Sequence, residues 1–89
     1  MWLRSDWREF FRRAGPQWRK YRPPRPVDLS GRGRVEPTAG FSLRELNDAG
    51  ISMEPAEVLG LPVDAGRVSA YGPNVSALRE FVRTTRGAG

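Results

Sequence analysis

The sequence contains no cysteine and no histidine. No disulfide can therefore stabilise the fold, and the usual thiolate and imidazole ligands of zinc are missing, so we expect neither a metal site nor a cofactor. A nucleophilic triad that depends on histidine is excluded as well. Glu54 and Glu57 are spaced as catalytic carboxylates sometimes are, but the sequence places no base or nucleophile beside them. We therefore expect no enzymatic activity and no small-molecule substrate.

Long apolar runs are also absent. No stretch approaches the roughly 20 apolar residues that a membrane-spanning helix requires, and the first residues, Met1 to Arg4, lack the apolar region of a signal peptide. These absences predict a soluble cytoplasmic protein with no membrane partner. The chain has 89 residues, which allows one small domain with a core of marginal stability.

The basic residues are concentrated in the N-terminal part of the chain. Residues 1–34 carry ten basic and three acidic side chains, 10 − 3 = +7, whereas residues 40–89 carry five basic and six acidic ones, 5 − 6 = −1. Such a cationic arm predicts a polyanionic partner. Aromatic residues lie between the cations and can stack on unpaired bases, which favours RNA over DNA. The candidate RNA-binding residues of the arm are Arg4, Trp7, Arg8, Arg12, Arg13, Trp18, Arg19, Lys20, Tyr21, Arg22, Arg25, Arg32 and Arg34.

Arginine greatly outnumbers lysine, since Lys20 is the single lysine among fifteen basic residues. Guanidinium groups bind phosphate in a bidentate manner and stack on bases, which ammonium groups cannot do. A GC-rich genome produces the same ratio through codon usage, and one sequence does not separate the two explanations.

The arm, residues 1–39, begins with one expected amphipathic helix at about residues 5–13. Ser5 can cap this helix, and Gly15-Pro16 ends it. Apolar side chains line one face, and arginines spaced four apart line another. Two interpretations remain open: the aromatic face packs on the chain's own domain below a solvated arginine row, or the helix binds a partner. That partner would be RNA in preference to an anionic membrane surface, for which the helix is short.

The rest of the arm shows no apolar period of either kind. Pro23 to Pro26 should be extended, near polyproline II, and Ser30 to Arg34 should be flexible and cationic. We expect this Pro/Gly/Arg-rich segment to take its shape only against a partner.

Residues 40–89 predict a small, mostly α domain of three short helices, at about 43–49, 53–59 and 73–85. Ser42 and Glu45 have the spacing of a capping box, and Gly50 supplies a stop. Ser52 can cap the second helix, and Gly60 can end it. The predicted core consists of Phe41, Leu43, Leu46, Ile51, Met53, Ala56, Leu59, Leu61, Val63, Val75, Leu78, Phe81 and Val82.

The first two of these helices are joined by a tight turn, as in a helix-turn-helix regulator that binds DNA. The second helix would then enter the major groove. It carries Glu54 and Glu57 and no lysine or arginine, so it would repel phosphates. DNA binding is therefore the alternative rather than the preferred function.

A set of short sequences in this domain resembles a known family. The sequences are Gly40-Phe41-Ser42-Leu43, Glu45-Leu46, Ala49-Gly50-Ile51, Ala56, Leu59-Gly60-Leu61-Pro62-Val63-Asp64, Asn74-Val75, Leu78 and Glu80-Phe81. They resemble the large-subunit ribosomal proteins of the thirteen-e family, found in archaea and eukaryotes, over residues 40 to about 83.

The resemblance implies a structural constituent of the large ribosomal subunit, without catalytic activity, whose basic extension runs over ribosomal RNA. It also implies large-subunit ribosomal RNA and neighbouring ribosomal proteins as partners. Members of the family usually carry a cluster of arginines after the Val-Asp pair, whereas this chain has Asp64-Ala65-Gly66-Arg67. Arg67 is the remaining candidate RNA contact of that loop.

Overall fold

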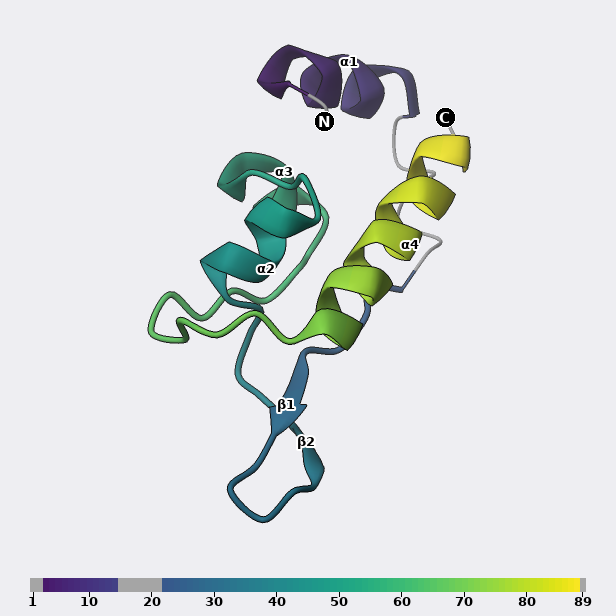
Figure 1. Cartoon of the computed structure of the whole chain (residues 1–89). Helices are drawn as coiled ribbons and strands as arrows, with labels where there is room; N and C mark the ends of the chain where they lie inside the picture. The colour runs from purple at the N-terminus through teal and green to yellow at the C-terminus, as the bar shows by residue number, and fades with distance from the viewer. Residues whose placement is uncertain (1–2, 15–21, 89) are drawn as a thin grey trace.

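The chain folds into four helices and one short hairpin over residues 3–14 and 22–88, which are the residues that the computed structural model describes. Their bounds are α1 (Arg4–Ala14), β1 (Val27–Leu29), β2 (Val35–Pro37), α2 (Leu43–Asp48), α3 (Met53–Val58) and α4 (Gly72–Ala88). The helices form the body of the molecule, and the hairpin projects from the end opposite α1 (Figure 1). The predicted mostly helical class is confirmed.

Helices α2 and α3 belong to two successive units of ten residues. Each unit begins with a serine and ends with a glycine followed by an apolar residue. Residues 42–51 form the first unit and residues 52–61 the second. The C-cap residue of each helix is followed by a glycine with positive φ, Gly50 at 78° and Gly60 at 76°. The next amide returns to the last turn, with 2.9 Å from Ile51 N to the Leu46 carbonyl oxygen in the first unit. This Schellman arrangement satisfies the helix-terminal carbonyls and buries an apolar side chain beside them.

The two units begin differently. The Ser42 hydroxyl accepts a hydrogen bond from the Glu45 amide, and the Glu45 carboxylate accepts one from the Ser42 amide, so the predicted capping box is confirmed. Ser52 occupies the N-cap position of α3 but makes no side-chain capping bond. The prediction that Ser52 caps the second helix through its side chain was therefore wrong.

The core lies between α2, α3 and one face of α4. Leu78 is fully buried, as are Phe41 and Ala56. Leu43 and Met53 were predicted to be in the core, but they are 46 % and 44 % exposed. Each is the first residue of its helix, just after the N-cap, and lies outside the face that the short helix buries. The core residues that contact one another are Trp7, Phe10, Phe41, Leu46, Ile51, Ala56, Leu59, Leu61, Leu78, Phe81 and Val82.

Helix α1 contributes two of those core residues. Trp7 is 1 % exposed and Phe10 is 5 % exposed, and the Trp7 ring stacks on Phe11 with 5.8 Å between ring centroids. An Arg8–Glu54 ion pair of 3.7 Å joins α1 to α3. Of the two interpretations of the amphipathic helix, packing on the chain's own domain is the one that this burial supports. Core contacts thus cross the predicted boundary between residues 39 and 40.

The hairpin occupies part of the segment that was expected to take its shape only against a partner. Strands β1 and β2 pair antiparallel, with Val27 opposite Pro37 and Leu29 opposite Val35. Gly33, at φ +74°, follows a turn closed by a 3.0 Å bond from its amide to the Ser30 carbonyl oxygen. A turn followed by a left-handed glycine is a common way to close a hairpin. The expectation that a partner is needed to give the segment its shape was therefore wrong for residues 27–37.

The segment after the hairpin is fixed by a very close backbone contact. Phe41 forms a parallel bridge with Val63, and the Phe41 amide bonds to the Pro62 carbonyl oxygen at 2.9 Å. A Cβ added at Gly40 would lie 2.5 Å from the carbonyl carbon of Val63. Glycine is required at this position because any side chain would collide with the backbone.

Candidate nucleic-acid interface

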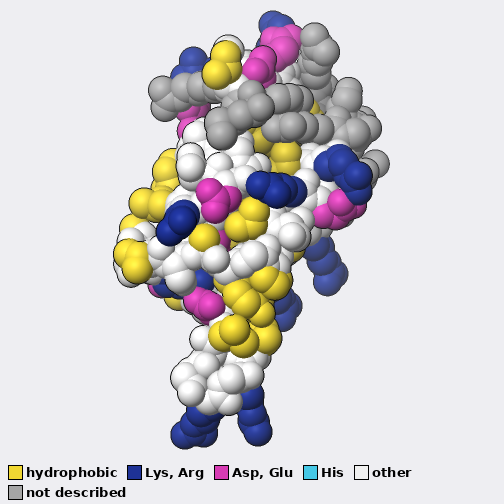
Figure 2. Space-filling view, in the orientation of Figure 1, with side chains coloured by type: hydrophobic (Ala, Val, Ile, Leu, Met, Phe, Trp, Pro, Cys, Tyr) yellow, Lys and Arg dark blue, Asp and Glu magenta, His cyan; other side chains and the backbone are white. Residues whose placement is uncertain are grey.

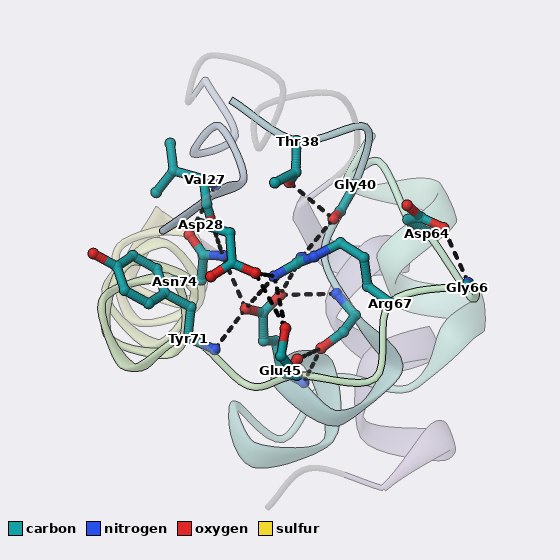
Figure 3. A network of polar contacts seen from close by, with 12 residues as sticks. Val27, Asp28, Thr38, Gly40, Glu45, Asp64, Gly66, Arg67, Tyr71 and Asn74 are labelled. Atoms are coloured by element: carbon teal, nitrogen blue, oxygen red, sulfur yellow. Dashed lines mark hydrogen bonds and ion pairs between the residues drawn. The ribbon is translucent and has the colours of Figure 1, made fainter. Parts of the chain in front are cut away.

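A buried carboxylate joins four parts of the chain (Figure 3). Glu45, on α2, is fully buried. Its two oxygens accept hydrogen bonds from the Ser42 amide at 2.8 Å, Arg67 Nη1 at 2.9 Å, the Tyr71 amide at 2.9 Å and Asn74 Nδ2 at 2.9 Å. We call Asp28, Glu45, Arg67 and Asn74 the polar cluster. It connects the hairpin, α2, the loop before α4, and α4 itself.

The hydrogen bonds of the polar cluster favour the ionised forms of its three charged members, Asp28, Glu45 and Arg67, by lowering the pKa of each carboxyl and raising the pKa of the guanidinium. Burial alone would raise the pKa of Glu45, but the hydrogen bonds from Arg67, Ser42, Asn74 and Tyr71 together lower the pKa below its usual value. The hydrogen bond to Glu45 is the main cause that raises the pKa of Arg67. A buried charge is tolerated when it is paired and when its remaining lone pairs are satisfied, and both conditions hold here.

Arg67 was predicted to contact RNA, but its guanidinium points into the protein. Its side chain is 13 % exposed. Besides Glu45, the guanidinium donates to Asp28 Oδ2 at 2.8 Å and to the Gly40 carbonyl oxygen at 2.8 Å. With these donors satisfied internally, Arg67 does not offer its fork to a phosphate. The structure therefore argues against an RNA contact by Arg67 and assigns it a structural position.

Asn74 fixes the hairpin to α4. Its amide nitrogen donates to the Val27 carbonyl oxygen at 2.6 Å, and its amide oxygen accepts from the Val27 amide at 3.1 Å. The side chain thus satisfies both backbone groups of the first β1 residue. Sequence reasoning missed this role because Asn74 and Val27 are 47 positions apart. The capping-box glutamate was the one member of the cluster that local spacing could identify.

The tip of the hairpin presents exposed arginines. Arg32 and Arg34 lie in or beside the turn, and Arg25 precedes β1; all three are exposed. The Ser30 hydroxyl accepts bonds from the Arg32 and Arg34 amides, at 3.2 and 3.3 Å, and so orders the turn. Figure 2 shows Lys/Arg side chains gathered at this end of the molecule. Among the described residues, no carboxylate forms an ion pair with these three arginines.

The remaining candidates of the arm are divided between different environments. Arg12 pairs with Glu9 at 2.6 Å, whereas Arg22 is exposed. Arg4 and Arg13 lie within α1. Trp7 was expected to stack on bases, but the core covers its ring, and this burial argues against that role. Trp18, Arg19, Lys20 and Tyr21 lie outside the described residues.

Other kinds of site find no support in residues 3–14 and 22–88. No group of carboxylates there is arranged to hold a metal ion. Within the same ranges, no helix combines the length and the apolar character needed to span a bilayer. The helix that would read DNA, α3, has its acidic Glu54 directed to Arg8 of α1. These observations leave the exposed hairpin as the strongest candidate interface.

Comparison with known proteins adds independent information. No family model matches the chain. The chain is similar to the large ribosomal subunit protein eL13 of Aeropyrum pernix, with 41 % identity over 70 residues. The aligned region covers 74 % of this chain and 84 % of the archaeal protein. Identity at this level over most of both sequences means that the chain belongs to the eL13 family of large ribosomal subunit proteins.

Proposed function

We propose that the chain is a structural constituent of the large ribosomal subunit that binds ribosomal RNA through exposed arginines, chiefly those of the hairpin, and docks through its helical body. The eL13 family is a family of structural ribosomal proteins and not of enzymes, and its members belong to the ribosome of the cytoplasm. The partners would be large-subunit ribosomal RNA and neighbouring ribosomal proteins.

The observation that carries the RNA contact is the projecting hairpin with cations at its tip. Arg32 and Arg34 are both exposed, and neither has a carboxylate partner among the described residues. A guanidinium can bind a phosphate through two parallel hydrogen bonds. A narrow projection that carries such groups can enter the space between RNA helices, where phosphates line both sides.

The RNA contact can be tested by its dependence on salt. Each phosphate contact contributes about −0.7 for single strands to −0.9 for duplexes in the logarithmic dependence of affinity on salt concentration. The double variant Arg32→Gln/Arg34→Gln should therefore bind large-subunit RNA more weakly, with a slope smaller in magnitude by about 1.4 to 1.8. Filter binding of the full chain at several salt concentrations would measure both quantities.

A matched control removes two arginines that already have carboxylate partners. Arg12 pairs with Glu9, and Arg83 pairs with Glu80. The double variant Arg12→Gln/Arg83→Gln has the same change in net charge, but it should change the slope much less. Equal slopes for the two double variants would mean that overall charge, and not the hairpin, supplies the contact.

Association with the ribosome can be tested in cells. Sucrose-gradient fractionation of a native lysate should place the protein in the large-subunit fractions. The hairpin double variant should move toward the free-protein fractions. Binding to DNA operators in place of ribosomal RNA would favour the helix-turn-helix alternative, which the acidic character of α3 disfavours.

A further inference from the structure

We propose that the polar cluster positions the hairpin for RNA binding, so that Asp28 and Arg67 are positioning residues and not RNA ligands. The inference rests on the proposed function, since it takes the hairpin arginines to be the RNA contact. It adds an intramolecular ion pair, made by β1 and not by the turn, that controls how the tip arginines are presented.

The hairpin needs support from outside itself. Each strand has three residues, and every residue of β2 is exposed. An isolated two-stranded hairpin of this size is marginally stable at best in water. Its described hydrogen bonds to the rest of the protein come from the first two residues of β1: Val27 bonds to Asn74, and Asp28 bonds to Arg67 and Ser69. The direction of the tip is therefore set by these contacts.

Asp28 is the link whose charge is essential. Its Oδ2 accepts from Arg67 Nη2 at 2.8 Å and from the Ser69 hydroxyl at 3.1 Å, while Oδ1 accepts from the Leu29 amide at 2.8 Å. In an Asp28→Asn variant that keeps the Leu29 bond, the amide NH₂ would face the Arg67 guanidinium, which can only donate. The link to Arg67 would be lost, whereas Arg67 would still be held by Glu45.

For Asp28→Asn, the positioning role and the change in net charge predict opposite effects on RNA affinity. Asp28→Asn removes a negative charge from the hairpin, which by electrostatics alone should strengthen RNA binding. Loss of positioning should weaken it. Glu36 provides a matched control, because it is the strand partner of Asp28 on β2, is exposed, and has no ion pair with any described residue. Glu36→Gln makes the same change in charge without touching the polar cluster.

The experiment compares the full-length wild type, Asp28→Asn and Glu36→Gln for binding to purified large-subunit ribosomal RNA at one salt concentration. Glu36→Gln should bind as well as the wild type or more tightly. Asp28→Asn should bind at least about threefold more weakly, the loss expected if the positioned fraction falls to about one third. Amide hydrogen exchange over residues 27–37 should be faster in Asp28→Asn than in the wild type, and unchanged in Glu36→Gln.

Arg67→Lys is a second variant that leaves the net charge unchanged. A lysine cannot bridge Asp28 and Glu45 as the guanidinium fork does, so it should also weaken binding and speed hydrogen exchange in the hairpin. Circular dichroism should show unchanged helices in Asp28→Asn.

Two outcomes would overturn the positioning role. One is that Asp28→Asn binds RNA as tightly as Glu36→Gln, and the other is that the helices of Asp28→Asn unfold together with the hairpin. If the wild type itself fails to bind the RNA, the proposed function fails instead.

Discussion

Among the described residues, Glu45 is the one charged side chain that is buried. It should make the free energy of unfolding depend on pH in the acid range. In the folded state the pKa values of Glu45 and Asp28 are lowered, for Asp28 mainly by the Arg67 hydrogen bond. The unfolded chain therefore binds more protons in mildly acidic solution. The stabilisation is fully present above the unfolded-state pKa of about 4 and is lost as pH falls through the lower folded-state pKa values.

Urea unfolding between pH 7 and pH 3 would measure this effect. The urea concentration at the midpoint of unfolding should decrease as the pH is lowered toward 3. Glu45→Gln should be less stable at pH 7, by up to about 3–5 kcal/mol because it breaks a buried pair, and its midpoint should depend less on pH. Glu36→Gln should keep the wild-type profile. A wild-type midpoint that does not change below pH 5 would contradict this role for the polar cluster.

Gly40 allows a second test at the level of one residue. Gly40→Ala would place a Cβ 2.5 Å from the Val63 carbonyl carbon and 2.6 Å from the Asp64 amide nitrogen. These are backbone atoms that cannot rotate away, so the substitution should cost at least about 1–3 kcal/mol of unfolding free energy. Gly72→Ala is the control, since nothing lies within 4 Å of a Cβ there. Similar unfolding midpoints for the two variants would show that the bridge can move apart.

The sequence identified some of these residues and not others for a physical reason. The Ser42–Glu45 capping box spans three positions, so local spacing predicts it. Arg67 is 22 positions from Glu45 and 39 from Asp28. An exposed arginine and a buried paired one look the same in sequence, and the pairing depends on how distant segments fold together.

At the scale of elements, α1 is held by a single apolar face. Trp7→Ala should lower the unfolding free energy by about 3–5 kcal/mol, because it removes a fully buried ring and leaves a cavity. In so small a domain this loss could unfold the chain. Leu3→Ala, just before α1, should have little effect because Leu3 is 68 % exposed. Thermal unfolding followed by circular dichroism would compare them, and equal stability of the two variants would mean that α1 does not pack on the core in solution.

The helices were easier to predict than the hairpin. Apolar spacing and glycine stops located α2 and α3 to within one residue at their ends. The hairpin strands are too short and too exposed to show an alternating pattern, so Gly33 was the main local signal for the turn. Periodicity also showed that α1 has an apolar face, but periodicity does not tell whether that face meets RNA or the chain's own core.

At the scale of the whole molecule, the cationic arm has two structural roles. Its first helix packs on the body through Trp7 and Phe10. Its hairpin projects from the opposite end (Figure 1) and carries Arg32 and Arg34, which are exposed. The division into an arm of residues 1–39 and a domain of residues 40–89 stays a prediction. A fragment of residues 40–89 would lack Trp7, Phe10 and Asp28, and so would lose part of the core and one carboxylate of the polar cluster.

The long sequence separations within the polar cluster impose an order on assembly. During synthesis the capping box can form as soon as residues 42–45 are free of the ribosome that makes the chain, but the hairpin cannot be anchored until Arg67 and then Asn74 follow. The arginine-bearing tip is thus made early and oriented late. If the tip binds RNA as we propose, a nascent chain would meet RNA first through a loosely held projection, and the fixed geometry of the hairpin would arise only after nearly the whole protein has been made.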